Sequence, residues 1–251
     1  MRSLLLHGLR GVRSYSMSTV EQAKRAAAFM AVDQHVQNNT VVGVGSGSTV
    51  VYAVERLTER VKNENLQLKC VPTSFQARQL IISNNLVLAD LETCPELDVA
   101  IDGADEVDAH LSCIKGGGGC QTQEKVVAAA AKKFVVVADY RKDSERLGQQ
   151  WEKGLPVEVV PFAYKPVAIK MERMGFEPVL RMAKNKAGPV ITDNGNVILD
   201  VKFDATQERD WKQVESNINN VAGVVEVGLF VGMANVAYFG MEDGTVKTRT
   251  P

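Results

Sequence analysis

The chain has 251 residues, which is long enough for one large α/β domain or for a large domain joined to a smaller one. Its composition, 45% hydrophobic and 24% charged, is that of an ordinary soluble globular protein. The formal net charge of −1 lacks the basic excess of a nucleic-acid binder. No apolar run approaches the roughly 20 residues that a membrane span requires.

The first 19 residues are rich in arginine and serine, and no acidic residue occurs before Glu21. This bias is typical of a mitochondrial transit segment and equally of a short disordered leader, and Met17 could be an alternative start. We therefore leave residues 1–19 out of the fold. The four cysteines show no CxxC spacing, which indicates reduced thiols. We expect a cytoplasmic protein, or a mitochondrial one if the leader directs import.

From residue 20 onward, predicted helices alternate with short apolar strands. Helices are expected over residues 21–36, 48–62, 75–85 and 123–133, and strands over 40–45, 67–74, 97–102 and 134–139. This alternation favours an α/β fold with a Rossmann-like, doubly wound and mostly parallel sheet, in which ligands bind beyond the carboxyl ends of the strands. The polar clusters GSGST, PTS and DGAD follow the first three strands at these ends.

Residues 151–225 follow a different pattern. Strands are expected over 156–162, 177–182, 189–192, 197–203 and 223–230, and helices over 164–175 and 208–219. The sequence Asp-Asn-Gly-Asn at 193–196 predicts a hairpin turn between the strands on either side of it. The order β-α-β-β-α-β indicates a ferredoxin-like α+β domain, inserted into an α/β domain made of residues 20–150 and 226–251. Because this smaller domain has no comparable polar cluster, we expect it to serve structure or oligomerisation.

The segment from Gly43 to Thr49 joins the first strand to a helix. Its glycines allow a tight turn, and Ser46, Ser48 and Thr49 add hydroxyl donors, so that with the helix dipole it forms an anion site. It lacks the third glycine of a dinucleotide fingerprint and the GK[ST] ending of a Walker loop. We therefore predict a cradle for a single phosphate; a turn that serves only strand-to-helix packing is the alternative.

Two carboxylates, Asp102 and Asp105, flank a second tight turn. This spacing suits hydrogen bonds to sugar hydroxyls, and it does not match a calcium loop. Glu106 and Asp108 continue the charge and are interpreted as a solvated acidic turn. His110, two residues further along, is interpreted as a surface residue.

Lys115 precedes four glycines, residues 116–119. Glycine costs up to about 1 kcal/mol per ordered residue, which a fold tolerates where backbone approaches a ligand or moves. Lys115 can donate to an oxygen that gains negative charge. Glu124 lies in the first turn of a helix, which favours the ionised form that a general base needs; an ordinary acid at a helix start is the alternative. Cys120 follows the glycines, so it could lie near the site; a small hydrophobic residue packed under the loop is the favoured interpretation.

Together, GSGST, PTSFQA, DGADEVD, KGGGG with TQEK, ADYRKDS, LPVEVVP and ITDNGNVILD resemble the type A ribose-5-phosphate isomerase family, from about residue 20 to the end. That family interconverts D-ribose 5-phosphate and D-ribulose 5-phosphate in the pentose phosphate pathway without metal or organic cofactor, and it usually forms homodimers or homotetramers. The resemblance implies that Glu124 is the catalytic base. It implies substrate binding by Lys24, Ser46, Gly47, Ser48, Thr49, Asp102, Gly103, Ala104, Asp105, Lys115, Gly116, Gly117, Gly118 and Lys142. At Gln123 many members carry arginine, and this departure concerns ligand affinity more than reaction type.

In the mechanism that this resemblance suggests, the cradle holds the 5-phosphate, and Asp102 or Asp105 assists opening of the furanose. Glu124 then moves a proton from C2 to C1 through an enediolate, whose charge Lys115 stabilises.

Two other classes of protein stay open. A non-catalytic sugar-phosphate sensor would need the phosphate cradle but neither Lys115 nor Glu124. A related enzyme, such as an aminosugar-phosphate deaminase or a coenzyme A transferase, would share the architecture. A deaminase is expected to use a histidine near the ring, and His7, His35 and His110 lie in no partnered motif.

Overall fold

The computed structural model describes residues 17–251, so most of the predicted leader lies outside the described residues. The first helix, α1 (Thr19–His35), begins two residues before the predicted start at Glu21. The reason is a cap, because Ser18 Oγ accepts a hydrogen bond from the backbone N–H of Glu21 at 3.3 Å. Within the described range, every helix is too short or too polar to cross a membrane.

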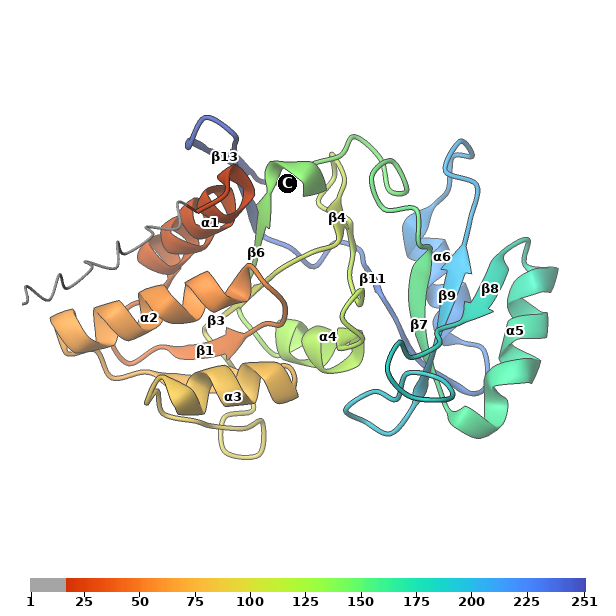
Figure 1. Ribbon diagram of the computed structural model, residues 1–251, viewed down its shortest axis with the longest axis horizontal. Coiled ribbons are helices and arrows are strands. Elements are labelled where there is room, and N and C mark those ends of the chain that lie inside the picture. The colour runs from red at the N-terminus through yellow and green to blue at the C-terminus, as the bar shows by residue number, and fades with distance from the viewer. Residues whose placement is uncertain (1–16) are drawn as a thin grey trace, which may run out of the picture.

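The larger sheet has six strands (Figure 1). In spatial order they are β13 (Val246–Arg249), β12 (Val236–Gly240), β6 (Phe134–Asp139), β3 (Val99–Asp102), β1 (Val41–Val44) and β2 (Lys69–Pro72). All neighbours are parallel except β12 and β13. The parallel strands are short apolar runs, as strands covered on both faces require. The predicted Rossmann-like sheet is confirmed, and the C-terminal segment extends it.

Helices cover both faces of this sheet. One apolar cluster packs α1, α2 (Val50–Glu64) and α3 (Phe75–Ser83) against residues such as Val42 and Val135. A second cluster packs α4 (Gln121–Ala129) against alternate residues of the same strands, such as Val136. Since successive strand side chains point to opposite faces, the two clusters follow directly from the strand sequences.

The smaller sheet has four strands and lies beside the larger one along the long axis of the molecule (Figure 1). In spatial order they are β10 (Val224–Val227), β7 (Leu155–Val159), β9 (Val197–Lys202) and β8 (Glu177–Leu180), with α5 (Tyr164–Arg173) and α6 (Trp211–Asn219) packed against them. All neighbours are antiparallel. This is the predicted ferredoxin-like order. The domain limits at residues 151 and 225 stay a prediction.

The predicted hairpin at residues 193–196 is wrong in one respect, because residues 189–192 form no strand and β9 pairs with β7 and β8 instead. The turn is present, with Gly195 N donating to Thr192 O at 2.9 Å. Its side chains are bound by the buried carboxylate of Glu158 on β7, which accepts from Thr192 Oγ1 at 2.8 Å and from Asn196 Nδ2 at 2.8 Å. Both edges of β9 are already paired, with β7 and with β8, so the segment before the turn has no free edge of β9 to join. Its Val190 N–H donates to the Arg181 carbonyl at 2.9 Å instead.

A third sheet, β11 (Leu229–Phe230), β5 (Cys113–Ile114) and β4 (Glu106–Val107), was not predicted, since strands of two residues leave no sequence pattern. The interpretation of Glu106 and Asp108 as a solvated acidic turn is wrong, because both residues are buried at this sheet. Glu106 accepts from Ser144 Oγ at 2.8 Å, Gly148 N at 2.5 Å and Gln150 N at 2.6 Å. Asp108 Oδ1 accepts from two backbone N–H groups of its own loop. These donors replace water and make the burial tolerable.

Candidate active site

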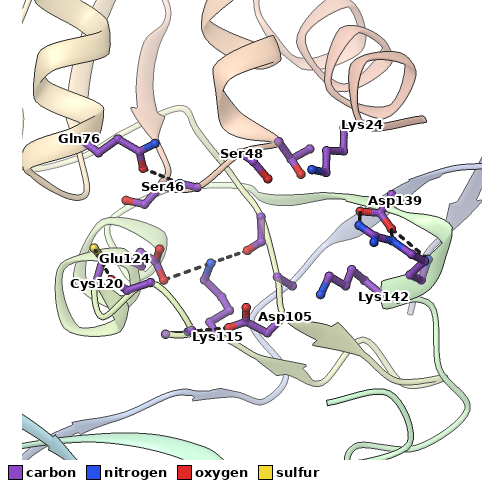
Figure 2. Close-up of a pocket in the computed structure, with 18 residues that line it drawn as sticks. Lys24, Ser46, Ser48, Gln76, Asp105, Lys115, Cys120, Glu124, Asp139 and Lys142 are labelled. Atoms are coloured by element: carbon purple, nitrogen blue, oxygen red, sulfur yellow. Dashed lines mark hydrogen bonds and ion pairs between the residues drawn. The ribbon is translucent and has the colours of Figure 1, made fainter. Parts of the chain in front are cut away.

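A cavity of about 270 Å³ opens at the carboxyl ends of β1, β3 and β6 (Figure 2). It is lined by Lys24, Ser46, Gly47, Ser48, Thr49, Gln76, Gly103, Ala104, Asp105, Lys115, Gly116, Gly117, Gly118, Cys120, Glu124, Asp139, Arg141 and Lys142. The structure thus brings together all the predicted site residues except Asp102, which lies directly behind the wall and is 2% exposed. Sequence reasoning missed Gln76, Asp139 and Arg141.

The GSGST turn lies against Asp102. A Cβ at Gly45 would lie 2.0 Å from Asp102 Oδ1, so only glycine fits at this position. That oxygen accepts from Ser46 N at 2.9 Å and from Gly103 N at 2.7 Å, which joins the first and third strand ends. α2 then begins without a side-chain cap and without an acid in its first turn. Its first N–H groups therefore remain for an anion.

The residues that follow β2 complete the cavity wall that the GSGST turn begins. Ser46 Oγ lies 2.8 Å from Thr73 Oγ1 and 2.6 Å from Ser74 Oγ, and Gly47 N donates to Gln76 Oε1 at 2.8 Å. The PTSFQA motif signalled this segment without singling out Gln76 within it.

Lys115 is a buried charge at the site, with its side chain 3% exposed. Its ammonium lies 2.9 Å from Asp102 Oδ2 and donates to the carbonyl of Gly103. It also lies 3.2 Å from Glu124 Oε2 (Figure 2). Burial by itself lowers the pKa of Lys115, but attraction to Asp102 and Glu124 outweighs it and raises this pKa above the usual value. Lys115 is therefore a fixed positive charge.

The Glu124 carboxyl group is buried in the first turn of α4. Burial and repulsion from Asp102 raise its pKa to about 8, although Lys115 acts in the opposite direction. An acid with this pKa can both accept and release a proton near neutral pH, as a group that moves a proton between two carbons must.

Asp105 lies on the cavity side of the acidic turn, and its Oδ2 accepts from Gly117 N at 2.6 Å. Burial raises the pKa of Asp105, and the Gly117 N–H and the charge of Lys115 offset part of that rise. Gly116 has a φ of +95°, which side chains rarely adopt. The four glycines therefore form a turn whose backbone approaches the carboxylate closely.

Cations line the opposite rim. Lys24 on α1 donates to Glu21 Oε1 at 2.7 Å. Arg141, in the short 3-10 helix η1 (Tyr140–Lys142), donates from Nε to Asp139 Oδ1 at 2.7 Å. The ADYRKDS motif pointed to Lys142 alone, and nothing in it distinguished Arg141.

The placement of Cys120 under the loop is wrong, because its side chain is partly exposed and lines the cavity. Burial and the neighbouring Glu124 raise the pKa of its thiol to about 12, so it is not a thiolate nucleophile. Gln123 does not line the cavity; its Nε2 donates to Asn194 Oδ1 at 2.8 Å. Neither His35 nor the exposed His110 lines the cavity, and His7 lies outside the described residues.

This fold and this site define an α/β enzyme that binds a small phosphorylated, hydroxyl-rich molecule and moves a proton on it. The sequence profile of the ribose 5-phosphate isomerase A (phosphoriboisomerase A) family matches residues 69–244. The ribose-5-phosphate isomerases of Sus scrofa and Homo sapiens are each 58% identical over 235 residues, covering 93% of this chain and 76% and 75% of theirs. The chain belongs to the ribose 5-phosphate isomerase A family.

Solved structures agree with this assignment. Ribose 5-phosphate isomerase A from Methanocaldococcus jannaschii matches with a TM-score of 0.85 and 41% identity, covering 91% of this chain and 98% of its own. A D-ribose-5-phosphate isomerase in complex with phospho-erythronic acid matches with a TM-score of 0.87 and 38% identity, covering 92% of this chain and 99% of its own.

Proposed function

We propose that this protein interconverts D-ribose 5-phosphate and D-ribulose 5-phosphate in the non-oxidative branch of the pentose phosphate pathway, with Glu124 as the base. The observation that carries the proposal is the buried Lys115 ammonium, 3.2 Å from Glu124 Oε2, in the same cavity as the GSGST turn. The family membership and the complex of a similar enzyme with phospho-erythronic acid support it.

The phosphate binds the GSGST turn at the start of α2. Ser48 and Thr49 supply hydroxyls and helix N–H groups, and Lys24 supplies a positive charge from α1. Arg141 and Lys142 add cations on the same rim. Binding energy from this remote group orients the reacting carbons at the other end of the cavity.

Proton transfer takes place at Glu124. Its carboxylate removes the C2 proton of the open-chain aldose, and the O1 oxygen gains negative charge in the enediolate. The O2 hydroxyl proton then passes to O1, and Glu124 returns its proton to C1 as the C2 carbonyl forms. Lys115 stabilises that charge, because it stays an ammonium and lies beside the Glu124 carboxylate that takes the C2 proton. Phospho-erythronic acid carries a phosphate at one end and a carboxylate at the other, which is the charge distribution of the phosphorylated enediolate.

Asp105 assists opening of the furanose ring in preference to Asp102. Asp105 lines the cavity and its pKa is raised, so it can hold and transfer a proton. Asp102 is behind the wall, where one oxygen accepts two backbone N–H groups and the other pairs with Lys115. Asp102 is better placed to hold Lys115 and the turn in position.

The two alternative classes fit less well. A sugar-phosphate sensor has no use for a buried Lys115–Glu124 pair that faces the ligand cavity, since burying charge is costly. A histidine-dependent deaminase would need a histidine at the cavity, and the lining contains none within residues 17–251.

The test is to incubate the purified protein with ribose 5-phosphate and EDTA and to follow ketopentose formation. Conversion to an equilibrium mixture, inhibited by phospho-erythronate, is expected. Absence of ketopentose with a folded, phosphate-binding protein would refute the proposed reaction.

We further propose that the protein acts in the cytoplasm as a homodimer or homotetramer. Apolar side chains at the edge of the smaller sheet support self-association: Phe162 in the short helix η2 (Pro161–Ala163) is 96% exposed, and Val160, Tyr164 and Val225 are exposed around it. Sedimentation of the wild type and of Phe162→Ser tests this, and a wild-type monomer would refute it.

A further inference from the structure

The glycine turn beside Lys115 is held from the smaller sheet. Arg181, directly after β8, donates from Nη1 to the carbonyl of Gly116 at 2.9 Å and to that of Gly117 at 3.3 Å. Arg181 itself does not line the cavity. It is therefore a group of the smaller domain that contacts the glycine turn from behind the cavity.

The guanidinium of Arg181 is fixed by a carboxylate. Its Nε donates to Asp200 Oδ2 at 2.8 Å, and its Nη2 donates to Asp200 Oδ1. Asp200 is on β9, which pairs with β8. The paired strands thus set the position of both residues. A planar guanidinium with five donors can hold one carboxylate with two N–H groups and still direct a third donor at the loop, which a lysine cannot do.

Because the peptide group is planar, fixing a carbonyl on the Arg181 side also fixes the direction of the next N–H group. In a trans peptide the carbonyl of one residue and the N–H of the next point in opposite directions. Fixing the Gly116 carbonyl therefore aims the Gly117 N–H, which donates to Asp105 Oδ2 at 2.6 Å. Fixing the Gly117 carbonyl aims the Gly118 N–H; Gly118 lines the cavity, and this N–H has no hydrogen-bond partner in the described part of the chain.

Glycine is the residue least able to hold such an orientation by itself, because it restricts φ and ψ so little. A Cβ at Gly118 would meet no atom within 4 Å. Within the turn, the Gly119 N–H donates to the Gly116 carbonyl at 2.9 Å. Arg181 adds a second donor to that carbonyl and supplies a hydrogen bond to the Gly117 carbonyl.

We propose that Arg181, anchored by Asp200, is a positioning residue for the isomerase reaction: it orients the Gly117 and Gly118 N–H groups toward Asp105 and toward an oxygen of the bound sugar. The proposal rests on the proposed function. Its consequence is that the smaller sheet controls turnover more than phosphate binding, since the phosphate cradle lies on β1 and α2.

The test compares Arg181→Met, Arg181→Lys and Asp200→Asn with the wild type, and uses Arg173→Met, an exposed arginine on α5, as the matched control. For Arg181→Met we expect kcat to fall by on the order of 10²-fold, the cost of a small misplacement of reacting groups. We expect the inhibition constant of inorganic phosphate to stay within about twofold, because the cradle is untouched.

The pH profile separates orientation from charge. The positive charge of Arg181 helps to lower the pKa of Asp105, so its removal raises that pKa further. In Arg181→Met the limb of the kcat profile that Asp105 sets, which is distinct from the limb near pH 8 that Glu124 sets, should move to higher pH. In Arg181→Lys the pH at which that limb falls should stay near its wild-type value, because the positive charge is kept. The value of kcat should remain low, because the forked set of guanidinium donors is lost.

Thermal melting and phosphate binding establish which variants are folded. If Arg181→Met does not fold, Asp200→Asn, which keeps the guanidinium but removes one of its anchors, decides. A folded variant of either position with wild-type kcat and pH profile would overturn the role of Arg181. A wild-type protein without isomerase activity would refute the proposed function itself. The two failures are distinguishable, because one is seen in the wild type and the other only in the variants.

Discussion

Replacing Glu124 with glutamine removes the proton acceptor at the centre of the site with little change of shape. Lys115 keeps its contacts with Asp102 Oδ2 at 2.9 Å and with the Gly103 carbonyl, so the electrophile remains in place. The amide cannot accept the C2 proton. A positioned base contributes about 10²–10⁴-fold, so kcat should fall by roughly 10³-fold, or about 4 kcal/mol of transition-state stabilisation.

The variant should remain folded, and the reason lies in the pKa of about 8 at Glu124. The native state then holds this proton more tightly than the unfolded chain, so wild-type stability falls as pH rises from about 4.5 through about 8. Glutamine mimics the protonated acid and avoids this loss. At pH 7 the melting temperature of Glu124→Gln should equal or exceed that of the wild type.

The assay follows C2 proton exchange of ribose 5-phosphate in D₂O by NMR, together with calorimetric binding of phospho-erythronate. The exposed Glu96→Gln serves as the control for loss of one negative charge. If Glu124→Gln exchanges the C2 proton at near the wild-type rate, Glu124 is not the base and the mechanism is wrong.

Three further outcomes are expected. The value of kcat/KM should rise with pH through about 8, because the base must be ionised and the pKa of Glu124 is raised to that value; a limb near the ordinary value of 4.5 would contradict this. Lys24→Met should raise KM by about tenfold or more with a smaller change in kcat, measured by initial rates, since it removes a charge-assisted bond to the phosphate; unchanged KM would remove Lys24 from the phosphate site. Glu106→Gln should lower the free energy of unfolding by about 1–3 kcal/mol in urea titrations, because the amide nitrogen would replace one of the two oxygens and face the donor N–H group of either Gly148 or Gln150; an unchanged midpoint would show that the carboxylate is dispensable.

The features that the sequence predicted correctly are those that depend on neighbouring residues. Alternating helices and apolar strands predicted the larger sheet, and the carboxyl ends of β1 and β3 then brought GSGST and DGAD together. Glu124 could be placed because it lies in the first turn of a helix that follows the glycine turn closely. In these cases the prediction needed only one general rule beyond the sequence, that ligands bind at the carboxyl ends of the strands of a parallel sheet.

The features that were missed depend on partners distant in sequence. Glu106 looks like a solvated acid until the backbone of residues 148–150 supplies its donors. The strand expected at 189–192 fails because β7 and β8, both earlier in the chain, already pair with the two edges of β9. Arg181 lies 65 positions from the Gly116 carbonyl that it contacts. Such pairs depend on where two elements meet, which periodicity does not encode.

These long-range contacts also explain why the reactive pair lies where two sheets meet. Lys115 follows β5, and its backbone N–H donates to the Gly228 carbonyl at 2.8 Å, in the segment between β10 and β11. A Cβ at Gly228 would lie 2.1 Å from the Lys115 carbonyl oxygen, so the two chains approach closely enough to admit only glycine. The backbone of Lys115 is thus fixed from the segment between β10 and β11, the glycine turn from β8 and β9, and the Glu124 carboxylate from α4 on the larger sheet. Because a buried charge pair keeps its geometry only while its surroundings are rigid, both sheets must be in place before Glu124 and Lys115 can act on one substrate.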